Sequence, residues 1–397
     1  MKAYRILTQT KIEPFERSVL DCSVLNTSLS SLQQEILEAA GFSLVSEPPR
    51  DENYFIFTDR MYFSVTLLEK IKKAGGGQLV CKDERWNQHM TSLLSQKDGR
   101  FEIAVVQGEP SFEGLDDLEI DWELREADEL KVHSSMKHAL RPMMIGASLV
   151  FSIAHWSDLL RVNQLAMLEK AERIRYQWKN AGLWFRISLV VHFFFKLRSL
   201  QQQKIARRIG TEGKNCKIHP TAVIEACEIG DNVEIGPYSV IRASVIGDGA
   251  KIEEHVTMNF SVIGQNARVN RYTMMNLSVL MDNALVSHGG GYQMCLFGQD
   301  SFVAVGATML DLSFGKTIKV WHQGKKIDSG QHFLGVCIGD RAKIGNAVRL
   351  TYGAMVPNDS FLVGGLDKLI IDPSGAISDE PMKAEAGKLV LARGTQK

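Results

Sequence analysis

The chain has only six cysteines, and no two of them form a CxxC pair. Without such pairs we expect neither a disulfide framework nor a cysteine-based zinc site, and a reducing cytoplasm suits the protein. The opening stretch MKAYRILTQTKIEPF lacks the apolar core of a signal peptide, so we expect a cytoplasmic location. No apolar stretch reaches the roughly 18 uninterrupted residues that predict a membrane-spanning helix.

The chain also lacks an excess of charge of either sign. Lys and Arg together number 46, and so do Asp and Glu, which argues against a generally basic protein that binds nucleic acid. Hydrophobic residues make up 45% of the sequence and charged residues 23%, as in ordinary globular proteins. A length of 397 residues is sufficient for two domains with sizeable cores.

An internal repeat dominates the C-terminal half. Between about Ile218 and Val363, aliphatic or aromatic residues recur in steps of 6, 6 and 5. The similar fragments IGDNVE, IGDGAK, IGQNAR, LMDNAL and FGQDSF begin at 229, 246, 263, 280 and 297, each 17 residues after the last. Three short strands joined by tight turns would close one triangular coil, and stacked coils would bury a continuous apolar column. The pattern predicts a left-handed parallel β-helix built from hexapeptide repeats.

The repeat predicts which side chains point inward. The leading apolar residue of each unit should face the interior, together with a small residue four places later: Val233, Ala250, Ala267, Ala284 and Ser301. The pattern stops over 312–334 and resumes at Ile338. Within this insertion, Ile318, Val320 and then Gly324 predict a hairpin that projects from the side of the β-helix.

The N-terminal 142 residues alternate between helical and strand patterns, which predicts an α/β domain. We expect helices over 28–42 and 61–77 and strands over 53–59, 102–106 and 118–124. Residues 143–211 are predicted to be a mostly helical linker. Within it, 180–208 is either a helix that packs the two domains together or an amphipathic helix that contacts the inner face of the membrane peripherally. The β-helix with its insertion spans 212–365, and 366–397 form a tail.

Two segments carry a family resemblance. The stretch from Val286 to Asp359, with His288 ten positions before Gly298 and with the insertion KTIKVWHQGKKIDSGQHFLG, resembles the acetyltransferase half of bifunctional sugar-1-phosphate nucleotidyltransferases. These enzymes make UDP-N-acetylglucosamine, and the archaeal forms are the most similar. The segment around Asp59, NYFIFTD followed by MYFSVTLLEKIKKA, resembles the strand and helix near the metal-binding aspartate of the same family.

The resemblance implies a CoA-dependent acyltransferase that acts on an amino sugar or a sugar nucleotide. His288 would be the general base that deprotonates the sugar amine, and histidine suits this role because its ordinary pKa is about 6.5. Acetyl-CoA or another acyl-CoA would be the co-substrate, and no metal is expected. Lys316 and Lys319 would bind phosphates, while Gly289, Gly290 and Asp311 would line the substrate site. The family resemblance also implies a homotrimer, with each site between neighbouring subunits.

Departures from the family pattern leave a second function open. No glycine precedes Gly41, so the N-terminal segment cannot form a glycine-rich phosphate loop, and this domain is expected to be a truncated, inactive relative. A family tyrosine is replaced by Gly291, and family asparagines fall at Phe302 and Asp311. The alternative is therefore a non-catalytic trimeric binding or scaffold protein. His255 is expected to be a corner residue of the β-helix; His322 and His332 either line a cleft or pack in the insertion.

Overall fold

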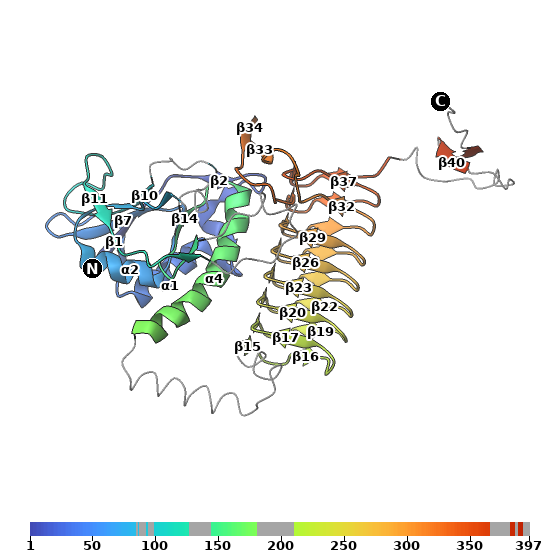
Figure 1. Ribbon diagram of the computed structural model, residues 1–397, viewed down its shortest axis with the longest axis horizontal. Helices are drawn as coiled ribbons and strands as arrows, with labels where there is room; N and C mark the ends of the chain where they lie inside the picture. Colours follow the sequence, from blue (N-terminus) through green and yellow to red (C-terminus); the bar gives the residue numbers. More distant parts are fainter. Residues whose placement is uncertain are drawn as a thin grey trace.

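A computed structural model describes residues 1–84, 86, 93, 99–126, 144–180, 210–365, 382–385 and 388–391. Figure 1 shows two bodies side by side, an N-terminal α/β domain and a three-sided prism of stacked coils. The long helix α4 (Trp156–Asn180) lies on the side of the N-terminal domain that faces the prism. The protein is therefore an α/β domain joined to a left-handed parallel β-helix, as the repeat predicts.

Each face of the prism is a sheet of short parallel strands. The first face contains β15 (Thr211–Glu212), β18 (Glu228–Ile229), β21 (Val245–Ile246), β24 (Val262–Ile263), β27 (Val279–Leu280), β30 (Leu296–Phe297), β35 (Cys337–Ile338) and β38 (Met355–Val356). The second contains β16 (Lys217–Ile218), β19 (Glu234–Ile235), β22 (Lys251–Ile252), β25 (Arg268–Val269), β28 (Leu285–Val286), β31 (Phe302–Val303), β36 (Lys343–Ile344) and β39 (Phe361–Leu362). The third contains β17 (Val223–Glu225), β20 (Val240–Arg242), β23 (Thr257–Asn259), β26 (Met274–Asn276) and β29 (Gly291–Gln293), and the pair β32 (Thr308–Met309) and β37 (Arg349–Leu350) follows β29.

The interior of the prism confirms the predicted repeat. Before the insertion, strands pair in register with partners 17 residues away, as Ile246 does with Ile263. The inward side chains form one apolar cluster, and the five predicted small interior residues are all buried. Removing an isoleucine, leucine or valine side chain of this cluster from water stabilises the fold by about 1.5–3 kcal/mol. The 17-residue repeat in the sequence is therefore sufficient to predict these inward-facing residues.

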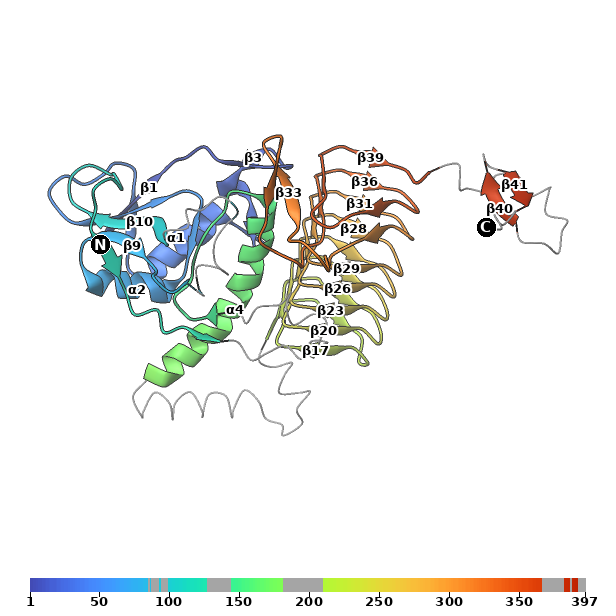
Figure 2. The same ribbon diagram turned by 45° about the horizontal axis from the view of Figure 1, so that its top comes forward.

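The insertion forms a hairpin of β33 (Lys319–His322) and β34 (Lys325–Asp328), with Gly324 in its turn. The hairpin itself confirms the prediction, but its placement differs. Figure 2 shows it between the N-terminal domain and the upper coils. Ile318 and Val320 are buried in the apolar cluster that also contains N-terminal residues, so one side of the hairpin is packed, while Lys319 and Trp321 on its other side are exposed. In this position the apolar side chains of Ile318 and Val320 are removed from solvent.

The N-terminal domain is built on a mixed sheet in the order β11-β9-β10-β7-β1-β6. Its strands are β1 (Lys2–Ile6), β6 (Ser43–Val45), β7 (Tyr54–Thr58), β9 (Gly77–Val80), β10 (Arg100–Val106) and β11 (Asp117–Glu119). The central strand β1 is parallel to both β6 and β7, whereas β10 is antiparallel to its neighbours. The carboxyl ends of β1 and β7 consequently meet at one edge of the sheet, where Asp59 lies.

Two of the expected N-terminal elements need correction. The helix expected over 61–77 is α2 (Val65–Ala74); the three residues before Ser64 form β8 (Met61–Phe63), which pairs with β14 (Val150–Ser152). Ser64 caps the helix with its side chain, so the helix cannot begin earlier. The strand expected over 118–124 is shorter, ending at Glu119. The helix expected over 28–42 is confirmed as α1 (Leu29–Ala39), with Ser28 as its N-cap.

The remaining elements are short. They are β2 (Lys11–Ile12), β3 (Arg17–Ser18), η1 (Val19–Asp21), β4 (Ser23–Val24), β5 (Thr27–Ser28), β12 (Arg125–Glu126) and β13 (Met144–Ile145), and a tail hairpin of β40 (Met382–Glu385) and β41 (Lys388–Leu391). The expected helix over 180–208 lies outside the described residues, apart from the last residue of α4. No helix in the described part of the chain is long and apolar enough to cross a membrane.

One apolar core joins the two bodies. The outward side chains of the first face, including Val262, Val279 and Leu296, belong to the same buried cluster as residues of α4 and of the N-terminal sheet. Polar contacts reinforce this junction: the Asn26 amide donates to the carbonyl of Ile263 at 2.8 Å, and Arg17 pairs with Asp340. The first face is therefore covered by the chain's own N-terminal half.

Candidate functional site

His288 lies in the turn between β28 and β29, at the corner where the second face meets the third. Its side chain is exposed, and no hydrogen bond to its imidazole comes from the described residues. One coil below, Arg271 lies at the equivalent position and pairs with both Glu253 and Glu254 at 3.2 Å. The imidazole therefore faces solvent above a cation whose charge is largely neutralised.

Three glycines follow His288, and we call Gly289, Gly290 and Gly291 the glycine notch. Gly289 adopts a φ of 75°, and a β-carbon there would meet nothing within 4 Å. A β-carbon at Gly290 would collide with the ring and hydroxyl of Tyr292, which fills the coil interior and whose pKa is raised by burial. The notch is thus open on its outer side and closed underneath by Tyr292.

An aromatic stack leads up to the glycine notch along the same corner. The rings of Tyr238 and His255 lie 5.2 Å apart at 18°, and those of His255 and Tyr272 lie 5.0 Å apart at 8°. His255 is thus a corner residue, as expected from its position in the repeat. The three residues recur every 17 positions, so the regular coil geometry itself produces the stack.

The other predicted site residues lie at the opposite edge of the third face. Asp311 follows β32, where the chain leaves the prism for the hairpin, and burial raises the pKa of its carboxyl, which also bonds the Gln293 side chain. The hairpin rests against the corner between the third and first faces, because a β-carbon at Gly353 would touch the Lys319 carbonyl at 3.0 Å. The third face therefore separates this edge from His288 within one subunit.

Lys316 and Lys319 are both exposed on the insertion. The carbonyl of Lys316 accepts a hydrogen bond from the Ser313 hydroxyl at 2.6 Å, which holds the backbone before β33. Lys319 is opposite Asp328 in the hairpin register. The hydroxyl of Thr317 lowers the pKa of Asp328, and Lys319 adds to the effect. Both ammonium groups are accessible to an anion, but neither lies on the His288 corner.

The carboxylate of Asp59 is hydrogen-bonded within its own domain. It is buried at the end of β7, and its two carboxylate oxygens accept the Thr8 backbone N–H at 3.0 Å and the Thr8 hydroxyl at 2.6 Å. The Gln33 amide also donates to the Asp59 carbonyl at 2.9 Å. The segment that follows β1 is therefore bonded directly to this aspartate. No group of three His, Cys, Asp or Glu side chains suited to a metal occurs among the described residues.

A histidine pair that the sequence did not indicate lies where the hairpin meets the N-terminal domain. The rings of His155 and His322 are 5.6 Å apart in a T-shaped contact, and Nε2 of His155 bonds the Trp321 carbonyl at 3.0 Å. Nδ1 of His322 is buried 3.6 Å from a carboxylate oxygen of Glu13. His322 is therefore a buried packing residue and does not line a cleft. The partners are 166 residues apart in the chain, so no local pattern could reveal them.

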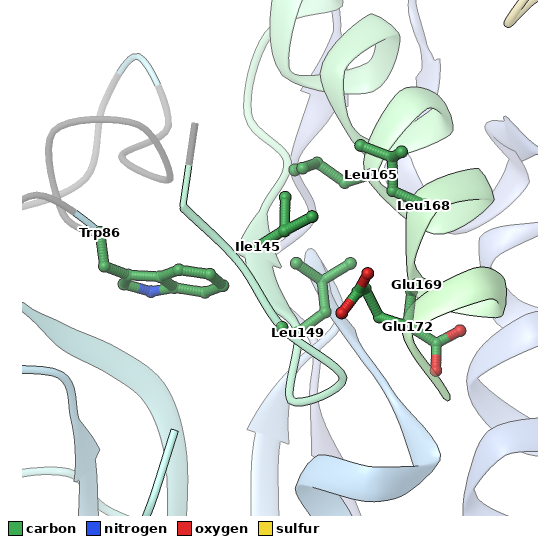
Figure 3. A pocket seen from close by; sticks show the side chains of 8 residues that line it. Trp86, Ile145, Leu149, Leu165, Leu168, Glu169 and Glu172 are labelled. Carbon is green, nitrogen blue, oxygen red and sulfur yellow. The ribbon is translucent and has the colours of Figure 1, made fainter. Parts of the chain in front are cut away.

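The N-terminal domain contains a small, open pocket between α4 and Trp86 (Figure 3). Its walls are mainly apolar: Ile145, Leu149, Leu165 and Leu168. Nε1 of Trp86 and Oε1 of Glu169 are buried there without a hydrogen-bond partner in the described part of the chain. Burial raises the pKa of Glu169. This pocket lies in the N-terminal domain, away from His288, and contains none of the predicted site residues.

One family model matches part of the repeat region. A family model described as the GMPPB C-terminal domain matches residues 209–303, a segment that includes His288 and the glycine notch. The repeat region is therefore similar to a C-terminal domain of the sugar-1-phosphate nucleotidyltransferase family. No curated protein matches the chain.

Many solved structures are similar to part of the chain, including the three that follow. A Bacillus cereus protein assigned as an acetyltransferase is 15% identical, with 39% of this chain and 78% of that chain covered and a TM-score of 0.23. The UDP-N-acetylglucosamine acyltransferase of Francisella novicida is 12% identical, with 39% and 61% covered and a TM-score of 0.17. A hexapeptide transferase family protein of Anaplasma phagocytophilum is 16% identical, with 39% and 78% covered and a TM-score of 0.17.

Proposed function

We propose that the protein is a CoA-dependent acyltransferase that acetylates an amino sugar or its nucleotide derivative. The observation that carries this proposal is the exposed imidazole of His288 beside the glycine notch. A general base must reach a proton on a bound substrate, and the missing side chains at Gly289 and Gly291 leave space for one. Acetyl-CoA is the proposed donor.

The proposed reaction transfers one acetyl group and consumes no other reagent. His288 takes a proton from the substrate amine as the nitrogen lone pair attacks the thioester carbonyl carbon. The C–N bond forms, the C–S bond breaks, and the CoA thiolate leaves with the proton that the imidazolium returns. The products are an amide and CoA thiol. Removal of this base is expected to slow the reaction by about 10²–10⁴-fold.

We further propose that the site is completed in a homotrimer. His288 lies at one edge of the third face, whereas Asp311, Lys316 and Lys319 lie at the other. Two prisms packed side by side would bring one edge of each together. The lysines would then bind phosphates of CoA or of a sugar nucleotide as point charges, and Asp311 would accept a sugar hydroxyl. The first face is already covered, so the second and third faces are left for this assembly.

A trimeric scaffold without catalysis is the second candidate, and two observations favour it. No described residue orients the imidazole of His288 by a hydrogen bond, whereas catalytic bases usually have such a partner. Both carboxylate oxygens of Asp59 are held by Thr8, which supports an inactive N-terminal domain. If the protein is a scaffold, the N-terminal domain (1–142) and the linker (143–211) would have a regulatory role in the cytoplasm or attach the protein peripherally to the membrane.

Calorimetric titration with acetyl-CoA, followed by a CoA-release assay with a panel of amino sugars, tests the proposal. We expect about one acetyl-CoA per subunit and turnover of at least one amine. His288→Ala should bind acetyl-CoA normally and lose about 100-fold or more in turnover. His219→Ala is the matched control, because His219 is exposed at the same corner in the lowest coil. A folded protein that binds no acetyl-CoA at millimolar concentration would favour the scaffold.

A further inference from the structure

The aromatic stack at the second-to-third corner ends with one ring face uncovered. Each ring of Tyr238, His255 and Tyr272 sits one coil above the last, and His255 is sandwiched between the two tyrosines. Tyr238 is 60% exposed and Tyr272 is 62% exposed. The lower face of Tyr272 is covered by His255. Its upper face points to the level of the next coil.

The next two levels of this column hold no side chain. Counting up the corner by coil register, the positions above Tyr272 are Gly289 and Gly306, and Ala347 follows. All three continue the left-handed conformation of the stack, with φ of 75°, 76° and 59° beside 60° at Tyr272. The backbone therefore continues regularly while the rings stop. Coils about 4.8 Å apart leave roughly 10 Å of free height above the Tyr272 ring.

The surroundings of this gap suit a flat polar ring that carries a negative tail. His288 lies beside Gly289, and a β-carbon at Gly291 would meet the Met274 methyl at 3.7 Å, so Met274 forms an apolar floor next to Tyr272. Arg349, whose side chain is exposed, lies two coils above Gly291 by register. An aromatic face at this corner, with an apolar side chain and a cation on the adjoining edge of the third face, matches a base linked to phosphates.

We propose that the base of a nucleotide stacks on Tyr272, in the levels left empty by Gly289 and Gly306, as a fourth ring of the column. This inference rests on the proposed function and sharpens it, because the base would anchor the nucleotide part of the co-substrate or of the sugar nucleotide. The adenine of acetyl-CoA and the pyrimidine of a sugar nucleotide share this chemistry. Stacking of a base on an aromatic side chain tolerates either ring, since each has a π-face.

Two variants and a matched control test the stacking site. Tyr272→Leu removes the ring but keeps an apolar side chain. Gly289→Tyr adds a ring in the empty level, and the corner already accepts tyrosine in this conformation at Tyr238 and Tyr272. Tyr238→Leu is the control, because it removes an equally exposed ring at the far end of the stack. Circular dichroism establishes that each variant is folded.

The measurement is the calorimetric Kd of three probes: acetyl-CoA, uridine diphosphate, and acetyl-phosphopantetheine, which lacks a base. For the nucleotide that uses the site, Tyr272→Leu and Gly289→Tyr should raise the Kd about tenfold or more. Tyr238→Leu should leave that Kd unchanged. Acetyl-phosphopantetheine should bind all four proteins equally. A response to acetyl-CoA alone identifies adenine as the base, and a response to uridine diphosphate alone identifies the sugar nucleotide.

Failure of this inference is distinguishable from failure of the proposed function. Equal nucleotide affinities in the wild type and all variants, or no nucleotide binding at all, would overturn the stacking site. If acetyl groups are still transferred in that case, the acyltransferase proposal stands without it. If nucleotides bind through Tyr272 but no amine is acetylated, the stacking site survives and the acyl-transfer chemistry is wrong.

Discussion

His155 shows how a single buried side chain ties the hairpin to the N-terminal domain. Its Nε2–H donates to the Trp321 carbonyl at 3.0 Å, while Nδ1 lies 2.8 Å from the Ser157 hydroxyl. The imidazole is therefore neutral and fully bonded. Burial lowers the pKa of His155 to about 4, with a smaller contribution from His322. Protonation of this residue would place an unsolvated charge at the interface.

The sign of the resulting pH effect follows from linkage. The unfolded chain binds a proton at His155 near pH 6.5, and the folded chain binds it only near the pKa of about 4. The stabilisation is therefore complete above pH 6.5 and is lost as the pH falls from 6.5 toward 4. Between pH 7 and pH 5 the expected loss is about 2 kcal/mol in the free energy of unfolding.

Urea unfolding of the wild type and of His155→Gln at pH 7 and pH 5 measures this contribution. Burial raises the pKa of nearby Asp158 to about 7, which gives an opposite pH slope in both proteins. The difference between the two proteins isolates His155: the wild type should lose about 2 kcal/mol more than the variant on acidification. Identical pH dependence in the two proteins would show that His155 does not titrate in this way.

At the scale of elements, the start of α2 is determined by one hydroxyl. The Ser64 hydroxyl accepts the N–H of Leu67 at 3.3 Å and that of Leu149 at 3.0 Å, and donates to the Ala147 carbonyl at 2.8 Å. It thus caps the helix and also bonds the segment before β14. Within the described part of the chain, the side chain of Ser28, the corresponding cap of α1, bonds only the neighbouring Ser31.

Serine-to-alanine changes at the two caps should differ in cost. Ser64→Ala leaves buried backbone groups of Ala147 and Leu149 unpaired in addition to losing the cap, so we expect about 2–3 kcal/mol of destabilisation. Ser28→Ala should cost about 1 kcal/mol or less. Denaturant unfolding followed by circular dichroism gives both values. Equal losses would mean that the Ser64 contacts to the second segment contribute nothing.

The helices and strands were predictable where a local rule governs them. Ser28 and Gly41 bracket α1 in the sequence as they do in the structure. The segment 61–63 was wrongly expected to be helical, because its apolar residues satisfy either period. Pairing with β14, which lies almost 90 residues later, decides it as a strand. Such long-range pairing overrides propensity and is invisible in a local window.

The candidate site was predictable only in part, for a related reason. The repeat placed His288 at a corner, and the structure agrees. The sequence also grouped His288 with Asp311, Lys316 and Lys319, but the coil geometry puts them on opposite edges of the third face. Their roles remain predictions. The aromatic stack was implicit in the 17-residue spacing of Tyr238, His255 and Tyr272, which becomes visible once the corner positions are aligned.

At the scale of the whole molecule, the N-terminal domain and the prism share a core. Val262, Val279 and Leu296 on the outer side of the first face are as buried as interior residues. The domain therefore acts as a fixed cover for one face and leaves the two faces that carry His288 accessible. This arrangement leads to the central claim that the functional site is assembled from edges of two subunits.

Mixed trimers test this claim most directly. We would refold His288→Ala together with the double variant Lys316→Ala/Lys319→Ala in equal amounts and measure CoA release with the best amine acceptor. Each variant alone should be nearly inactive. If the site forms between subunits, random mixing restores both halves at about a quarter of the interfaces, and activity should rise to about 25% of wild type. A mixture no more active than the average of its two components would contradict a site shared between subunits.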